Sequence, residues 1–524
     1  MRRQTGVRPF LHACTIRTIL PYRGDAPIIC RGVQLPALTS WTDEALIALD
    51  TLSDRASGFI LPSLRLGVTG LSRAGKTVFI TALVHNLLHG GRLPLFKAYR
   101  SGRIARAYLQ PQPDDAVPRF QYEDHVDALV NERIWPDSTR AISELRLVIE
   151  YESATLFGRI MPAGRLALDI VDYPGEWLLD LPLLGKDFAA FSTESLSLAS
   201  LPGRKDLALG WLSETGSVDP DAPADEMTAQ RLARSFTEYL KAARSDERAL
   251  STLPPGRFLM PGDLEGSPAL TFAPILRKVD GPARSGSLAA MMQRRYEAYK
   301  AHVVKPFFRQ HIARLDRQIV LVDAMQAMNA GADAVADLER ALADILACFR
   351  PGRFGPLAGL LTRRIGRILI AATKADHLHH ESHDRLEAIT RRLVERAIER
   401  AGMSGAKVEV MAMAAVRATR EATASHGGEM LPVITGTPIE GETIAGERFD
   451  GNTETAVFPG DLPVDPSAAF ALPEAAVPGQ SDEMIRFVRF RPPKLERTAE
   501  GVALSLPHIR LDRALEFLVG DRLA

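Results

Sequence analysis

The sequence predicts an α/β fold in which a mainly parallel sheet carries a large helical insertion. Short apolar runs of strand length alternate with helical stretches, which is typical of a parallel sheet with crossover helices. A glycine-rich loop joins the first of these strands directly to a helix. The stretch between Asp172 and Gln318 is far longer than one crossover helix needs, so a separate helical subdomain is expected there.

The composition is that of a globular protein. Of the 524 residues, 46% are hydrophobic and 24% are charged, which excludes a wholly disordered chain. The 64 Lys and Arg residues balance the 64 Asp and Glu residues, so no nucleic-acid partner is predicted. Three cysteines are too few for a disulfide framework, and no apolar run reaches the length of a membrane span. A cytoplasmic location is expected, with attachment to the inner membrane through a partner as the alternative.

Shifts in composition divide the chain into parts. The first 24 residues contain arginines but no acid, and Pro9 and Pro21 interrupt any targeting helix. We expect six parts in chain order: a disordered or spurious N-terminal tail (1–40), the first part of the core (41–178), a helical insertion (179–315), the second part of the core (316–420), an acidic Pro- and Gly-rich excursion (421–482), and a C-terminal strand and helix that complete the core (483–524).

Hydrophobic periodicity gives the elements of this core. The expected strands are Leu64–Thr69, Glu144–Tyr151, Leu166–Val171, Gln318–Asp323, Arg367–Ala372 and Val408–Met413. Within the insertion, Met227–Ala243 and Leu288–Arg314 have the spacing of amphipathic helices. The chain ends with an amphipathic helical stretch from Ile509 to Leu523.

The loop after the first strand carries the strongest motif. The segment GLSRAGKT, from Gly70 to Thr77, matches G-x-x-x-x-G-K-S/T and lies between a strand and a helix, as this motif requires. Successive backbone N–H groups and the helix N-terminus are expected to bind phosphate oxygens. The residues expected to bind the nucleotide phosphates are Gly70, Ser72, Arg73, Ala74, Gly75, Lys76 and Thr77.

Three of these residues are given individual roles. We expect Lys76 to reach the β- and γ-phosphates and the Thr77 hydroxyl to bind Mg²⁺. Arg73 is a candidate for charge on the transition state. The alternative for Arg73 is a side chain that points to solvent or pairs with an acid of the insertion.

A second motif follows the strand Leu166–Val171. Asp172 to Gly175 fits D-x-x-G, which predicts a carboxylate near Mg²⁺ and a glycine N–H at the γ-phosphate. Glu176 follows that glycine directly and is the candidate for positioning the attacking water. The alternative is an acid that only ends its strand.

A second metal ligand is expected before the strand Glu144–Tyr151. Thr139 is our choice, and Ser138 is its competitor. An ordinary turn or helix-cap residue is the other interpretation.

A third motif follows the strand Arg367–Ala372. Thr373 to Asp376 fits N/T-K-x-D, in which the aspartate accepts hydrogen bonds from N1–H and the exocyclic amine of guanine. Lys374 is expected to lie along the base and brace the phosphate loop. After the last strand, Ala415 and Val416 occupy the position of a loop whose backbone reads the guanine carbonyl oxygen.

Several stretches together resemble the YcjX-like family of bacterial P-loop NTPases, described as stress-associated. The resemblance rests on GLSRAGKT, DYPGEW, RQIVLVDAMQAMNAG and TKAD, and on the C-terminal RFRPP and PHIRLDRALEFL. It covers Trp41 to the C-terminus. The resemblance implies a P-loop core of the Ras-like GTPase type, a large helical insertion and guanine-nucleotide binding.

These observations predict a guanine-nucleotide-binding protein that hydrolyses GTP slowly with Mg²⁺, as a switch in a stress-related bacterial process. Slow turnover is expected because Glu176 is charged and stands beside phosphates. The first alternative is an ATPase that binds ATP and ADP, with TKAD a coincidental match. The second is a nucleotide-gated interaction module with little turnover, whose insertion binds a membrane-associated or stress-response protein.

Overall fold

A computed structural model describes most of the chain from residue 61 onward. The described residues are 61–71, 73–137, 139, 141–154, 164–246, 253–277, 281–348, 365–402, 405–426, 429–444, 446–470, 487–495 and 505–524. The predicted tail, 1–40, and the first residues of the predicted core, 41–60, lie outside the described residues.

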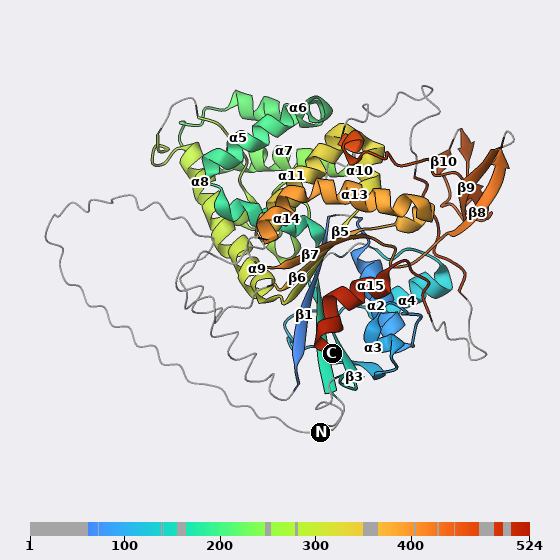
Figure 1. Cartoon of the computed structure of the whole chain (residues 1–524). Helices are drawn as coiled ribbons and strands as arrows, with labels where there is room; N and C mark the ends of the chain where they lie inside the picture. The colour runs from blue at the N-terminus through green and yellow to red at the C-terminus, as the bar shows by residue number, and fades with distance from the viewer. Residues whose placement is uncertain are drawn as a thin grey trace, which may run out of the picture. The chain divides into compact units, whose positions relative to one another are not determined.

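Within these residues, seven strands form the central sheet in the order β2-β3-β4-β1-β5-β6-β7 (Figure 1). Their bounds are β1 Ser63–Gly70, β2 Ile104–Gln110, β3 Ser143–Tyr151, β4 Gly164–Asp172, β5 Arg317–Val322, β6 Arg367–Ala372 and β7 Lys407–Ala412. Strands β4, β1, β5, β6 and β7 run parallel, whereas β2 and β3 are antiparallel at one edge. The predicted α/β fold with a mainly parallel sheet is confirmed.

Strand β2 is the one strand of the central sheet that hydrophobic periodicity did not predict. Its sequence, IARAYLQ, is half-exposed or exposed along its length, so it lacks the apolar run of a buried strand. The six strands that were predicted are each buried on at least one face, and all six occur in the structure.

Helices cover both faces of the sheet, which explains why its parallel strands are largely apolar. In β5, Val320 and Val322 belong to one buried cluster, whereas Ile319 and Leu321 belong to the other. The covering helices are α2 (Lys76–Leu88), α10 (Ala324–Ala330), α11 (Ala332–Cys348), α13 (His383–Leu393), α14 (Glu395–Gly402) and α15 (Leu511–Val519). Figure 1 shows α13 and α14 on one side of the sheet, with α2 and α15 on the other.

Shorter elements complete the core, and the label η marks 3₁₀ and π segments. They are α3 (Lys97–Arg100), α4 (Tyr122–Asp127), η1 (Ala128–Glu132), η3 (Gly175–Gly185), η9 (Ala375–His377), η10 (His380–Ser382) and η12 (Gly520–Arg522). Of these, η3 begins at the glycine of the D-x-x-G motif, so its position links that motif to the insertion.

The insertion between η3 and β5 is mainly helical. Its elements are α5 (Phe188–Ala199), α6 (Pro202–Ser217), α7 (Glu226–Ser245), η4 (Gly256–Phe258), η5 (Gly262–Leu264), η6 (Pro268–Leu270), α8 (Leu288–Tyr299), η7 (Lys300–Val304), α9 (Lys305–Gln310) and η8 (Ile312–Arg314). Asp225 caps α7 by accepting a hydrogen bond of 2.8 Å from the Thr228 N–H. None of the helices in the described ranges combines the length and the apolar character that a membrane crossing requires.

The acidic, Pro- and Gly-rich part of the chain carries a small sheet of its own. Its elements are β8 (Arg420–His426), β9 (Glu429–Gly436), β10 (Thr443–Ile444), β11 (Glu447–Arg448), β12 (Thr455–Val457) and η11 (Pro466–Phe470), and β8, β9 and β12 form an antiparallel sheet. Residues 487–495 pack Val488 and Phe490 against this sheet, with an isolated bridge from Phe490 to Pro438. The C-terminal strand expected in this region is therefore absent from 487–495, whereas the C-terminal helix joins the core as α15.

Candidate nucleotide-binding site

The predicted site residues meet at one edge of the sheet. Strands β1, β4, β6 and β7 are all parallel within one sheet, so their carboxyl ends lie at the same edge. Gly70 ends β1 and Asp172 ends β4, while Thr373 directly follows β6. In open α/β sheets this edge is where ligands bind.

The phosphate loop has the backbone that its glycines predict. Gly75 adopts a φ of 85° at the N-cap of α2, a left-handed conformation that glycine takes without steric cost. Lys76 begins α2, and its buried ammonium donates a hydrogen bond of 3.0 Å to the Gly70 carbonyl oxygen. Ala74 is buried beneath the loop, whereas the Arg73 side chain is exposed. Ser72 lies outside the described residues.

The three predicted metal ligands are adjacent. The Thr77 Oγ1 lies 3.4 Å from the Thr139 Oγ1, and the Thr139 hydroxyl donates a hydrogen bond of 2.5 Å to Asp172 Oδ2. These residues come from α2, the segment before β3, and the end of β4. The competitor, Ser138, lies outside the described residues.

The charges and donors of this cluster suit a magnesium ion. Burial raises the pKa of Asp172 to about 6, an effect that the nearby Lys76 partly offsets. Its second oxygen, Oδ1, is buried and has no hydrogen-bond partner among the described residues. Two hydroxyls and one carboxylate supply the oxygen ligands that Mg²⁺ prefers, so the residues fit this ion.

Lys76 is a desolvated cation at the centre of the site. Burial lowers its pKa, while Asp172 and Glu176 act in the opposite direction by stabilising the charged ammonium. A buried ammonium that has lost much of its hydration gains strongly from an anionic ligand. The position of Lys76 is therefore suited to a phosphate group.

Gly175 lies against the phosphate loop. A Cβ atom at this position would overlap the Gly70 carbonyl oxygen and lie 3.0 Å from the Lys76 Nζ. Glu176, the next residue, is 3% exposed and forms an ion pair of 2.7 Å with Arg244. The motif that follows β4 thus touches the phosphate loop on one side and the insertion on the other.

The base-reading motif is joined to the loop after β7. Asp376 is buried, and its Oδ2 accepts a hydrogen bond of 2.8 Å from the Ala418 N–H. The Ala375 N–H donates a hydrogen bond of 3.1 Å to the Met413 carbonyl oxygen. Ala415 and Val416 lie between these two contacts along the chain, and their role in reading the base stays a prediction.

Lys374 is placed differently from our expectation. Its ammonium forms an ion pair with the Asp323 carboxylate at the end of the neighbouring strand β5, rather than bracing the phosphate loop. The Lys374 backbone has a φ of 62°, and Asp323 also caps α10 by accepting a hydrogen bond from the Gln326 N–H. The ends of β5 and β6 are adjacent in the sheet, which brings this acid within reach of Lys374.

Comparison with known proteins agrees with this geometry. The YcjX-like family, DUF463, matches residues 64–523. The chain is 37% identical over 475 residues to the Ras-like GTPase YcjX of Escherichia coli (strain K12), which covers 88% of this chain and 96% of the relative. It is 35% identical over 479 residues to the Ras-like GTPase YcjX of Shewanella oneidensis (strain MR-1), covering 88% of this chain and 94% of the relative.

The chain belongs to the YcjX-like family. The resemblance found in its motifs is therefore confirmed, and so is the P-loop core that the motifs predicted.

The site of this YcjX-like chain includes a residue that the sequence did not reveal. Arg244 lies in the last turn of α7 and reaches Glu176 across 68 positions of the chain. No motif surrounds Arg244, and α7 has two other arginines, so only the tertiary contact distinguishes it.

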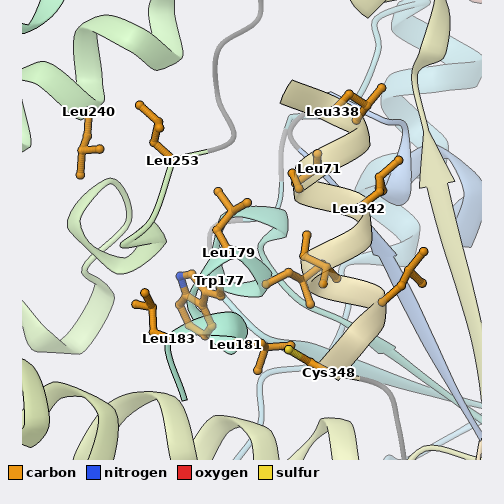
Figure 2. Packing of buried hydrophobic residues seen from close by; sticks show 14 of the residues in the cluster. Leu71, Trp177, Leu179, Leu181, Leu183, Leu240, Leu253, Leu338, Leu342 and Cys348 are labelled. Atoms are coloured by element: carbon orange, nitrogen blue, oxygen red, sulfur yellow. The ribbon is translucent and has the colours of Figure 1, made fainter. Parts of the chain in front are cut away.

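A second unpredicted feature of the YcjX-like chain is the contact between η3 and the insertion. The Asp180 carboxylate accepts hydrogen bonds from the Gly256 N–H (2.7 Å), the Arg257 N–H (3.2 Å) and the Tyr299 hydroxyl (2.6 Å). Figure 2 shows Trp177, Leu179, Leu181 and Leu183 of η3 among Leu240, Leu253, Leu338 and Leu342, all within one buried cluster. A displacement of η3 would therefore change its hydrogen bonds and packing contacts with the insertion.

Proposed function

We propose that the protein binds guanine nucleotides with Mg²⁺ at this site and hydrolyses GTP slowly, as a switch. The observation that carries the proposal is the hydrogen-bonded series of Thr77, Thr139 and Asp172 beside the buried Lys76. Three distant segments of the chain supply these groups; Thr77 and Asp172 were expected from motifs, and Thr139 from its position before the strand Glu144–Tyr151. The two relatives are named Ras-like GTPases, which supports guanine as the base and hydrolysis as the reaction.

Different residues of the chain would bind the phosphates and the metal ion. The backbone N–H groups of the phosphate loop and the Lys76 ammonium bind the phosphates, while Thr77, Thr139 and Asp172 hold the metal. When bound, Mg²⁺ neutralises charge on the phosphate oxygens. Gly175 has no side chain, so its backbone N–H can approach the γ-phosphate closely.

We assign the positioning of the attacking water to Glu176. A carboxylate in this role is the reason we propose for slow turnover. Glu176 is an acid beside the proposed phosphate site, and it pairs with Arg244 in this structure. Replacement Glu176→Ala is expected to reduce single-turnover hydrolysis of GTP while GDP binding is kept. Hydrolysis that remains unchanged in this variant would remove Glu176 from the mechanism.

Asp376 is the proposed guanine-selecting residue. A carboxylate has about four lone-pair sites, and the Ala418 N–H uses one of them while fixing the orientation of the group. The remaining sites can accept from the N1–H and the exocyclic amine of guanine. Adenine offers an acceptor at N1, which a carboxylate repels.

Calorimetric titration with GDP, GTP, ADP and ATP, each with Mg²⁺, tests this proposal. We expect the wild type to prefer guanine nucleotides and Asp376→Asn to lose roughly 100-fold in GDP affinity, since charged hydrogen bonds contribute about 1.5–3 kcal/mol each. Asp384→Asn is the matched control, because its carboxylate is exposed and pairs only at the surface, with Arg510. Equal or better binding of ADP and ATP by the wild type would overturn the guanine assignment and favour the ATPase alternative.

The contacts of η3 favour a second candidate, a nucleotide-gated interaction module with little turnover. Asp180 and the apolar side chains of η3 tie the segment after Gly175 to the insertion. Limited proteolysis of the insertion with GDP, with a non-hydrolysable GTP analogue and without nucleotide tests this candidate. Identical cleavage patterns in the three states would count against it. The stress-related process, the membrane-associated or stress-response partner and the cytoplasmic location stay predictions.

A further inference from the structure

We propose that Arg244 is a catalytic residue that the insertion supplies to the γ-phosphate of GTP during hydrolysis. This inference rests on the proposed function, because it names a further group for the same reaction. Arg244 belongs to α7 in the insertion, whereas the phosphate loop, Asp172 and Glu176 belong to the core. The insertion would then complete the active site.

The position of Arg244 carries the inference. Its Nη2 lies 2.7 Å from the Oε1 of Glu176, the residue after Gly175. Gly175 in turn lies against Gly70 and Lys76 of the phosphate loop. A guanidinium group therefore stands one side chain away from the place expected for the γ-phosphate. The side chain is 28% exposed, so it is not fixed in the interior.

The partner of Arg244 is a carboxylate, which a phosphate group can replace. Lys76 lies near the same segment, since a Cβ atom on Gly175 would be 3.0 Å from its Nζ. Glu176 provides one carboxylate between them, and its Oε1 forms no hydrogen bond within the described residues. A γ-phosphate brings more negative charge than Glu176 and would compete with it for the guanidinium.

Other arginines near this segment are placed less suitably. The Arg257 guanidinium lies over the Trp177 ring, 3.1 Å from its centroid, so its charge is engaged there. Arg73 is in the phosphate loop, but its side chain is exposed. Arg244, by contrast, pairs through its guanidinium group with Glu176, the residue that follows the D-x-x-G motif.

The positive charge of Arg244 would stabilise the transition state of hydrolysis. The water oxygen forms a bond to the γ-phosphorus as the bond from that phosphorus to the β–γ bridging oxygen breaks. The products are GDP and inorganic phosphate, and the proton from the water ends on the phosphate. Negative charge spreads over the transferred group and the leaving oxygen, where an arginine is worth about 10³–10⁵-fold in rate. Transfer of Arg244 to the phosphate also frees Glu176 to orient the water.

Single-turnover hydrolysis of GTP by the full chain tests the proposal. Arg244→Ala is expected to slow hydrolysis by at least about 100-fold while the affinity for GDP stays within about threefold of wild type. Arg244→Lys is expected to recover little, since an ammonium lacks the planar donor fork. Arg231→Ala is the matched control, because Arg231 lies on the same helix and pairs with Glu214 at the surface. Wild-type hydrolysis by Arg244→Ala would overturn the proposal.

Two further measurements separate catalysis from positioning. GDP with aluminium fluoride imitates the transition state, so Arg244→Ala is expected to lose this complex but to keep GDP, and added guanidinium ion is expected to restore part of the hydrolysis. In a Glu176→Ala background, Arg244→Ala is expected to slow hydrolysis further. If the double variant is no slower than Glu176→Ala, Arg244 acts only by holding Glu176. If the wild type neither binds nor hydrolyses GTP, both the proposed function and this proposal fail.

Discussion

Gly175 shows how one missing side chain shapes the site. A Cβ atom here would meet the Gly70 carbonyl oxygen and the Leu71 backbone, and neither can move without displacing the phosphate loop. The sequence identified this glycine by its motif. The structure adds that close packing against the loop excludes every other residue at this position.

Gly175→Ala is expected to slow GTP hydrolysis at least tenfold and to lower the free energy of unfolding by about 1–3 kcal/mol, the usual range for overpacking. Gly185→Ala in the same segment is the control, because a Cβ there would meet nothing within 4 Å. Single-turnover kinetics and urea unfolding give both quantities. Equal behaviour of the two variants would show that the contact with Gly70 is unimportant.

Asp180 is a buried acid whose titration is coupled to stability. Burial raises its pKa to about 6 from an ordinary value of 3.8, although the Tyr299 hydroxyl and two backbone N–H groups lower it in part. Between these two pH values the folded state binds a proton that the unfolded state does not. This carboxylate therefore contributes more to stability below pH 4, and that contribution is lost as the pH rises through 6.

The matched variant is Asp180→Asn, which removes this titration. We expect the free energy of unfolding of the wild type, relative to the variant, to increase by about 1 kcal/mol as the pH falls from 7 to 5, since one pKa unit corresponds to about 1.4 kcal/mol. Urea unfolding of both proteins at several pH values measures the difference. Parallel profiles would mean that Asp180 keeps its ordinary pKa in the folded state.

At the scale of elements, η3 is held between the phosphate loop and the insertion. Its first residue touches the loop, while Asp180 and Trp177 contact residues of the insertion, with Trp177 donating a hydrogen bond of 3.2 Å to the Met260 carbonyl oxygen. Because η3 is short and packed on both sides, a shift at the nucleotide must alter at least one of these contacts. The segment is therefore suited to carry a change in nucleotide state to the insertion.

Tyr299→Phe tests the contact between η3 and α8. The change removes a donor that lies 2.6 Å from Asp180 and leaves a buried carboxylate with fewer partners. We expect a loss of about 1–3 kcal/mol in the free energy of unfolding, and faster proteolysis within the insertion. Tyr99→Phe is the control, since the Tyr99 hydroxyl bonds the Gly90 carbonyl oxygen at the surface. Cleavage at the wild-type rate by Tyr299→Phe would show that this contact does not hold the two elements together.

At the scale of the whole molecule, the C-terminal segment completes both the core and the site. Leu511, Leu515 and Leu518 of α15 are fully buried in the cluster that contains α2. The Leu506 N–H donates a hydrogen bond of 2.9 Å to the Asn86 side chain on α2. The segment also forms the bridge between Ile509 and Ala414, which fixes the loop that contains Ala415 and Val416.

Removal of residues 505–524 is expected to abolish folding of the core. Burial of three leucines contributes roughly 5–9 kcal/mol, which is comparable to the roughly 5–15 kcal/mol of stability of a whole protein. Thermal unfolding by circular dichroism and GDP titration measure the outcome. Removal of residues 1–40, the predicted tail, is the control and is expected to change neither quantity. A shortened chain that melts cooperatively at the wild-type temperature would contradict this role of α15.

The sequence by itself determined the fold class, the six strands buried in the central sheet and the three motifs of the candidate site. Apolar runs reveal strands that are covered on both faces, and phosphate, metal and base recognition each need fixed residue types at short spacings. The sequence did not predict β2, because that strand is half-exposed. It also did not predict the small sheet of β8, β9 and β12, because polar residues interrupt the apolar pattern of these strands.

The tertiary structure decided which side chains from distant segments meet. Thr139 and Asp172 form a hydrogen bond across 33 positions, Lys374 pairs with Asp323 instead of bracing the loop, and Arg244 reaches Glu176 from the insertion. Each of these contacts depends on how helices and loops pack on the sheet, and charged side chains on exposed helices carry no local signal of their partners. The residues proposed to bind phosphate could therefore be identified from the sequence, whereas the contacts that join them to the insertion depend on the packed fold.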